Sequence, residues 1–285
     1  MNPLPDEKEK NERKIEIGSA AHALLLNQPV EIRVLEFDAY TTKASKEARA
    51  MAKDDGAIPL LTADHELVTN MIARAKLDLA LDTDPVVRSI ARPDSYEHEA
   101  FNEVVACWQD MGGLWCRARI DRLVIAPDRI TIIDYKTTEM SAAPQDVAKA
   151  IFNNTYHLQD GFYRRAIRHL FPQVNNHEVK LDFLFIVQEQ EPPHEITSAR
   201  IDAPGRVIGE KMAGAGVRLW HNAMTKNEWS GYPRQVVEAQ MPPYVETKWL
   251  AREVEDERFE GLAFDPMGPM EMNPYRPADK EVFFG

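Results

Sequence analysis

The chain has little cysteine and no long apolar run. Cys107 and Cys116 are its 2 cysteines, and their spacing fits neither a disulfide scaffold nor a zinc or iron–sulfur motif. No apolar run exceeds about five residues, far short of the ~20 that cross a bilayer. The charged residues 1–14 also lack the apolar core of a signal peptide. We therefore expect a soluble, unexported protein with reduced thiols in the cytoplasm.

The chain also lacks an excess of positive charge. Its 34 Lys and Arg stand against 46 Asp and Glu, for a formal net charge of −12. This excludes a protein that coats nucleic acid by bulk charge, because such binding depends on basic residues that neutralise phosphates. It still allows an enzyme that holds DNA through divalent metal ions and a local basic groove. No Gly-rich phosphate loop is present, which argues against ATP-driven translocation within this chain.

The order of predicted elements indicates an α/β or α+β protein. We expect a flexible tail over residues 1–14, a single domain over 15–260 and a Pro-rich arm over 261–285. Apolar periodicity and breaker residues predict the remaining elements. The predicted helices are 18–26, 43–53, 62–81, a helical region 145–170 and 205–224; the predicted strands are 101–108, 114–125, 129–136, 179–188 and 195–201.

Two carboxylates face each other in the predicted antiparallel hairpin. A turn centred on Pro127-Asp128 places Asp121 directly opposite Asp134, with Cβ atoms roughly 5 Å apart. Facing carboxylates repel, so a fold that keeps them usually adds a proton or a cation. Strand alternation places Lys136 on the face of Asp134. This set suits Mg²⁺ or Mn²⁺ and phosphodiester hydrolysis, whereas the plain alternative is a hairpin with a polar solvent face.

The hairpin residues belong to a longer series of motifs. In chain order the motifs are Gly18-Ser-Ala-Ala-His22, Asp121, Ile-Ile-Asp134-Tyr-Lys136-Thr-Thr and Tyr156-His-Leu-Gln159-Asp-Gly-Phe-Tyr163. They resemble the motifs of the PD-(D/E)XK nuclease superfamily. Their order resembles the RecE-like branch, the phage recombination exonucleases of the exodeoxyribonuclease VIII type. The resemblance spans residues 17 to about 170. It implies a restriction-endonuclease-like α/β core, in which helices flank a mixed central sheet with an antiparallel meander.

The resemblance also implies a metal site. Its ligands would be His22, Asp121, Asp134 and the backbone carbonyl of Tyr135. Lys136 would be the catalytic lysine, with Asp121 and Asp134 as its acidic catalytic partners. The family has a further acidic residue near the first meander strand, and Glu103 is the match, although Glu97 and Glu99 lie close enough to be alternatives.

Further residues would contact substrate. Gln159 and Tyr163 lie one helical turn apart and so project from one face, which in the resembled family lies beside the active site. Thr137 and Thr138 can donate hydrogen bonds to a phosphate. Basic residues flank Asp121 and either line a substrate groove or balance the carboxylates; they are Arg117, Arg119 and Arg122.

The function implied by the resemblance is that of an Mg²⁺- or Mn²⁺-dependent exonuclease on ends of linear double-stranded DNA, with 5′ to 3′ resection for recombination. It further implies a ring-like homo-oligomer, a single-strand annealing protein as partner, and a bacterial or phage-infected cytoplasm. One alternative is another nuclease of this fold, such as a nicking or structure-specific endonuclease. A CRISPR-adaptation nuclease would need clustered iron–sulfur cysteines, which are lacking. Another alternative is a catalytically silent DNA-binding module, which would have no need for facing carboxylates.

Overall fold

The computed structural model describes residues 5–232 and 234–255, and the chain divides into two units, Met1–Ser230 and Gly231–Gly285. In the second unit the described residues include one helix, α8 (Pro243–Glu255). The expected arm over 261–285 lies outside the described residues. None of the helices in the described ranges is long and apolar enough to cross a membrane.

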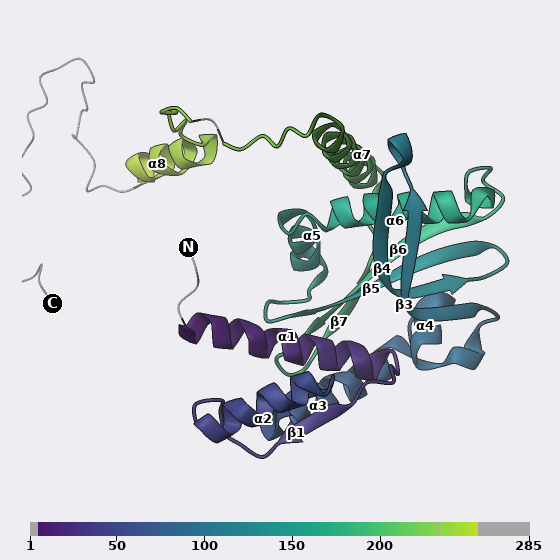
Figure 1. Ribbon diagram of the computed structural model, residues 1–285, viewed down its shortest axis with the longest axis vertical. Helices are drawn as coiled ribbons and strands as arrows, with labels where there is room; N and C mark the ends of the chain where they lie inside the picture. The colour runs from purple at the N-terminus through teal and green to yellow at the C-terminus, as the bar shows by residue number, and fades with distance from the viewer. Residues whose placement is uncertain (1–4, 233, 256–285) are drawn as a thin grey trace, which may run out of the picture. The chain divides into compact units, whose positions relative to one another are not determined.

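A mixed sheet forms the centre of the first unit (Figure 1). Its strand order is β3 (Glu99–Gln109), β4 (Trp115–Ile125), β5 (Arg129–Thr138), β6 (Lys180–Glu189) and β7 (Ile196–Ala199). The pair β5–β6 is parallel and its neighbours are antiparallel. The predicted meander and the α/β fold class are confirmed. A separate parallel pair, β1 (Ile32–Leu35) and β2 (Ile58–Leu61), was not predicted.

Helices cover both faces of the sheet. On one face lie α1 (Pro5–Leu25), α3 (Thr62–Leu79) and α4 (Pro85–Ala91), whose core includes Ile133, Tyr135 and Ile186. On the other lie α5 (Pro144–Asn153) and α6 (Tyr156–Leu170), around Ile132 and Phe185. Neighbouring strand residues thus belong to opposite cores, as strand alternation requires. The remaining elements are α2 (Lys43–Asp54), α7 (Ala203–Lys226), η1 (Pro93–Ser95), η2 (Met111–Gly113) and η3 (Pro172–Val174).

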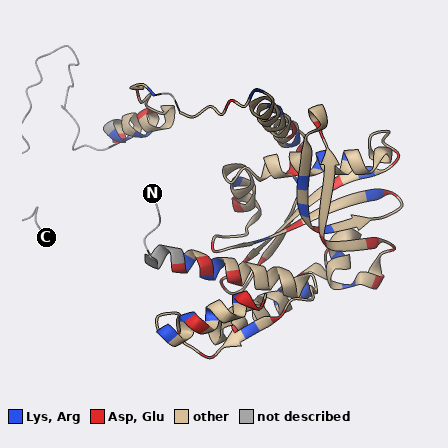
Figure 2. Cartoon of the chain, in the orientation of Figure 1, with Lys and Arg blue, Asp and Glu red and all other residues tan. Residues whose placement is uncertain are grey.

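Two segments differ from their predicted form. Residues 5–14, expected to be a flexible tail, belong to α1 because ion pairs hold them: Arg13 donates to both carboxylate oxygens of Asp64, at 2.8 and 2.6 Å. Figure 2 shows charges of both signs along α1. The region 145–170 is two helices, α5 and α6, because Thr155 at φ 57° interrupts the helical backbone.

Close contacts fix α6 against α7 and against the β3–β4 hairpin. A Cβ on Gly209 of α7 would lie 1.9 Å from the carbonyl oxygen of His157, so only glycine allows this approach. At the hairpin tip the Asp110 carboxylate accepts hydrogen bonds from Arg165 of α6, at 3.0 and 2.5 Å. Burial raises the pKa of Asp110, but hydrogen bonds, chiefly from Arg165, outweigh it and lower that pKa to about 2.

Candidate metal centre

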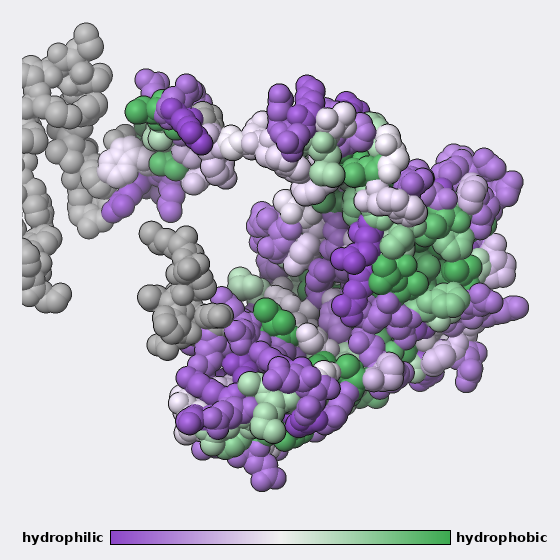
Figure 3. All heavy atoms as spheres, viewed as in Figure 1, coloured by the Kyte–Doolittle hydropathy of each residue, from purple (hydrophilic) through white to green (hydrophobic). Residues whose placement is uncertain are grey.

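A cavity of about 630 Å³ lies over strands β3, β4 and β5, with residues of α1 and α6 in its lining. Figure 3 shows the molecule hollowed between the side that carries α1 and the side that carries the β3–β4 hairpin. The polar side chains of its lining include His22, Glu103, Asp121, Asp134, Lys136 and Gln159. Residues from distant parts of the chain therefore meet in one solvent-accessible site.

The β4–β5 register brings two of the carboxylates onto adjoining strands. Arg122 pairs with Ile133, which is the register that the Pro127-Asp128 turn predicts. The ladder ends at that pair, so Asp121 and Asp134 are neighbours rather than ladder partners. Asp121 Oδ2 instead accepts a hydrogen bond from the backbone N–H of Tyr135 at 3.0 Å.

Glu103 sits at an irregularity in strand β3. Its φ of 52° lies in the left-handed region, and the ladder with β4 passes from Asn102–Arg122 to Val104–Ile120 without pairing it. Such a conformation costs about 1–3 kcal/mol and needs support from its surroundings. Gln28 supplies some of it, because its Nε2 donates to Glu103 Oε1 at 2.6 Å. Arg119 forms an ion pair with the other carboxylate oxygen.

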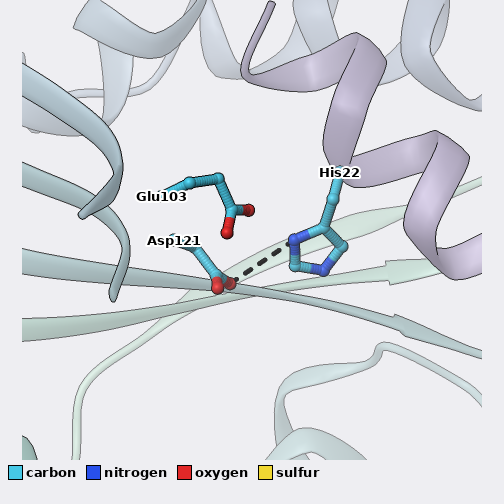
Figure 4. Close-up of side chains that lie close together, drawn as sticks. All are labelled: His22, Glu103 and Asp121. Atoms are coloured by element: carbon cyan, nitrogen blue, oxygen red, sulfur yellow. Dashed lines mark ion pairs between the residues drawn. The ribbon is translucent and has the colours of Figure 1, made fainter. Parts of the chain in front are cut away.

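His22, Glu103 and Asp121 form a potential ligand cluster. One ligand atom from each lies within 4.8 Å of the others, and Figure 4 shows the imidazole of α1 beside the two carboxylates from the sheet. His22 Nδ1 is 3.5 Å from Asp121 Oδ2, and its ring packs on Tyr135 with 4.9 Å between centroids. Burial is the main cause of the lowered pKa of His22, which favours the neutral ring that binds metals.

The cluster favours a divalent cation electrostatically. Burial, and then the charge of Asp134, raise the pKa of Asp121 to about 7. A carboxylate that is costly to ionise in the metal-free protein becomes stable when a cation faces it. One imidazole with several carboxylate oxygens is a donor set that fits Mg²⁺ or Mn²⁺. The residues present therefore fit the ion that the motifs imply.

Asp134 lies beside this cluster and is held by two side chains. Its Oδ1 accepts a hydrogen bond from Gln159 Nε2 at 2.5 Å, and its Oδ2 is 2.6 Å from Lys136 Nζ. Burial lowers the pKa of Lys136, but the Asp134 charge and hydrogen bond outweigh it, so the net pKa is raised. Lys136 is thus a fixed ammonium group at the cavity wall, 5.0 Å from the Tyr156 ring centroid.

The other predicted substrate residues divide into two groups. Tyr163 and Thr137 line the cavity, Tyr163 with its ring against Phe183. Burial raises the pKa of the Tyr163 hydroxyl. Thr138 does not line it, and its Oγ1 accepts a hydrogen bond from the backbone N–H of Met140 at 2.9 Å. The hydroxyl still has its own proton to donate, so a contact of Thr138 with a phosphate stays a prediction.

Among the open alternatives, the structure places Glu103 at the cluster, whereas Glu97 and Glu99 do not line the cavity. Of the flanking arginines, Arg119 lines it, and Arg122 is buried with its Nη1 on Asn102 Oδ1 at 2.9 Å.

Sequence reasoning missed Gln28 as part of the site. It follows α1 at the Asn27-Gln28-Pro29 break, which marks only the end of a helix. Its contact with Glu103 joins residues 75 positions apart, so no local sequence pattern predicts that contact.

The chain matches the family model of the PD-(D/E)XK nuclease superfamily over residues 2–265. Among solved structures it is similar to a crystal structure named "Putative exonuclease" from Eubacterium rectale. That similarity has a TM-score of 0.46 at 10% sequence identity, and covers 83% of this chain and 79% of the other. No curated protein matches the chain significantly.

Proposed function

The chain belongs to the PD-(D/E)XK nuclease superfamily, and from this premise we propose that it is a metal-dependent exonuclease on the ends of linear double-stranded DNA. The proposal includes the RecE-like type, with 5′ to 3′ resection for recombination in a bacterial or phage-infected cytoplasm. A ring-like homo-oligomer and a single-strand annealing partner belong to the same proposal. The observation that supports the chemistry best is the His22–Glu103–Asp121 cluster beside the Asp134–Lys136 ion pair.

The proposed ligands of the ion are His22, Asp121, Asp134 and the backbone carbonyl of Tyr135, with Glu103 as a further acidic ligand. The packing of the His22 ring on the Tyr135 ring, with 4.9 Å between centroids, supports this set, because it keeps Tyr135 beside the cluster. A bound Mg²⁺ or Mn²⁺ would supply Lewis-acid stabilisation of phosphate charge and a lowered pKa for water.

Side chains of the protein would orient the reactants and stabilise charge. Lys136 carries its charge at the cavity wall, where it can orient the attacking water and stabilise negative charge that develops on the phosphate. Gln159 holds Asp134 through one oxygen and so fixes the direction of the other toward Lys136. Tyr163, one turn along the same helix, also lines the cavity, and its hydroxyl would serve as a hydrogen-bond donor.

The test is digestion of linear duplex DNA labelled separately at its 5′ and 3′ ends, with Mg²⁺, and with a covalently closed circle as a second substrate. Wild type should release label from linear DNA only, from the 5′ end first. Lys136→Ala should abolish release, whereas Lys149→Ala, which removes an exposed lysine of α5, should leave the rate unchanged. Circular dichroism of both variants should match wild type.

Each other outcome rejects part of the proposal. Cutting of the circle would identify an endonuclease of the same fold. Release from the 3′ end would contradict the RecE-like polarity. Binding of DNA without metal-dependent cutting of either substrate would identify a catalytically silent module, and Lys136→Ala with full activity would show that the chemistry lies elsewhere.

A further inference from the structure

The β3–β4 hairpin has one covered face and one bare face. Its covered side chains pack in the core beneath α6; they are Ala106, Trp108, Ala118 and Ile120. The alternate side chains of both strands are exposed; they are Val105, Cys107, Gln109, Trp115, Arg117 and Arg119. No described helix covers this second set, although an antiparallel sheet usually keeps apolar and aromatic side chains on its packed face.

The bare face has an unusual composition for this chain. It contains no carboxylate and two arginines, in a protein whose net charge is −12, and Figure 2 shows basic positions on β4. The Trp115 side chain is 68% exposed. An exposed indole beside arginines on a ladder is the combination that proteins use for single-stranded nucleic acid, in which basic groups follow the backbone and aromatic rings stack on bases.

The bare face starts at the proposed metal centre. Arg119 lines the cavity and pairs with Glu103, and Asp121 lies two residues further along β4. At 3.3–3.4 Å per residue, Arg119, Arg117 and Trp115 lie roughly 7, 13 and 20 Å from Asp121 along the strand. The cross-strand partners Val105, Cys107 and Gln109 widen this line into a two-stranded surface.

We propose that the bare hairpin face binds a single DNA strand that continues from the cavity. Arg119 and Arg117 contact successive parts of its sugar–phosphate backbone, and Trp115 stacks on an unpaired base. The inference rests on the proposed function, since that function makes DNA the ligand. The ligand is single-stranded because stacking on Trp115 needs a free base face, which a paired and stacked duplex does not offer inside its helix.

Binding can be measured by fluorescence anisotropy of a fluorescein-labelled oligothymidylate, with the full chain and with EDTA so that no hydrolysis occurs. Trp115→Ala should weaken binding between about fivefold and 150-fold at an unchanged salt slope, and Trp115→Phe should retain most of the affinity. Arg117→Ala should reduce the slope of log K against log salt by about 0.7, as loss of one phosphate contact on a single strand predicts.

Matched controls come from other exposed positions. Phe152→Ala removes a half-exposed aromatic ring of α5, and Arg92→Ala removes an exposed arginine that follows α4. Both should bind the oligothymidylate like wild type. A fully paired duplex of the same length should bind Trp115→Ala and wild type equally.

The inference is overturned if Trp115→Ala and Arg117→Ala bind like wild type, or if wild type does not bind the single strand. It is also overturned if the loss of affinity accompanies a change of mass in light scattering, because the bare face would then be an interface between copies of the chain. These binding measurements do not depend on hydrolysis. A chain without nuclease activity can therefore still bind or not bind the single strand, so the binding proposal and the nuclease proposal are tested separately.

Discussion

Replacing Asp121 by asparagine should stabilise the metal-free protein at alkaline pH. Burial and the Asp134 charge raise the pKa of Asp121 to about 7, whereas an aspartate in an unfolded chain titrates near 3.9. Between these values the folded protein retains a proton that the unfolded chain has lost. Stability therefore falls as pH rises from about 4 to about 7 and remains reduced above that range.

The size of the effect follows from the two pKa values. Their difference converts to about 4 kcal/mol at most in the free energy of unfolding. Asparagine has nearly the same shape and retains an oxygen that can accept the Tyr135 N–H bond, which is 3.0 Å long in the native protein. We expect Asp121→Asn to be about 2–4 kcal/mol more stable than wild type at pH 8 in EDTA, and similar in stability near pH 4.

Urea unfolding between pH 4 and pH 8 gives the measurement, and the difference between the two proteins isolates Asp121. His22 acts in the opposite direction, because its lowered pKa adds stability as pH rises. Saturation of wild type with Mn²⁺ at 100 times its Kd should restore about 2.7 kcal/mol, with a smaller gain in the variant. Parallel pH profiles in EDTA, or a variant less stable than wild type at pH 8, would refute this reasoning.

Three further perturbations test other contacts. Gly209→Ala should lower the free energy of unfolding by about 1–3 kcal/mol through overpacking. Gly216→Ala, with open space around its Cβ position, should raise it by about 0.5–1 kcal/mol. Equal melting temperatures for the two variants would contradict this prediction. The lowered pKa of Asp110, about 2, means that its ionised carboxylate adds to the free energy of unfolding above about pH 4 and that this contribution is lost as pH falls toward 2. Asp110→Asn should therefore make the stability less dependent on pH in acid unfolding followed by circular dichroism. An acid transition identical to that of wild type would contradict this prediction. Gln28→Met should weaken Mn²⁺ binding about 10- to 100-fold in isothermal titration, and an unchanged Kd would show that Glu103 needs no such support.

Local sequence predicted the β4–β5 hairpin because its register depends on a short turn. Pro127-Asp128 and the alternating residues around it fix the pairing of Arg122 with Ile133. That register places Asp121 on one strand and Asp134 and Lys136 on the adjoining strand. The α/β class and the main helices were likewise predictable, because apolar periodicity within one element reports which face is buried.

Longer-range features were not predictable in the same way. Residues 5–14 have the composition of a tail, but they lie in α1, where ion pairs to distant segments such as Arg13–Asp64 hold its described side chains. The β1–β2 pair is short and parallel, so its strands are joined through a helix rather than a tight turn that would mark them. The break at Thr155 depends on a left-handed residue that carries no glycine or proline signal.

The sequence by itself determined which residue types could serve a nuclease and, through motif order, that His22 belongs with Asp121, Asp134 and Lys136. Only the tertiary structure decided how they meet. The β3–β4 register places Glu103 opposite Asp121, and α1 on the sheet brings His22 to both. Contacts such as Gln28–Glu103 join residues 75 positions apart, and packing of helices on the sheet, rather than any periodicity within one element, brings such residues together.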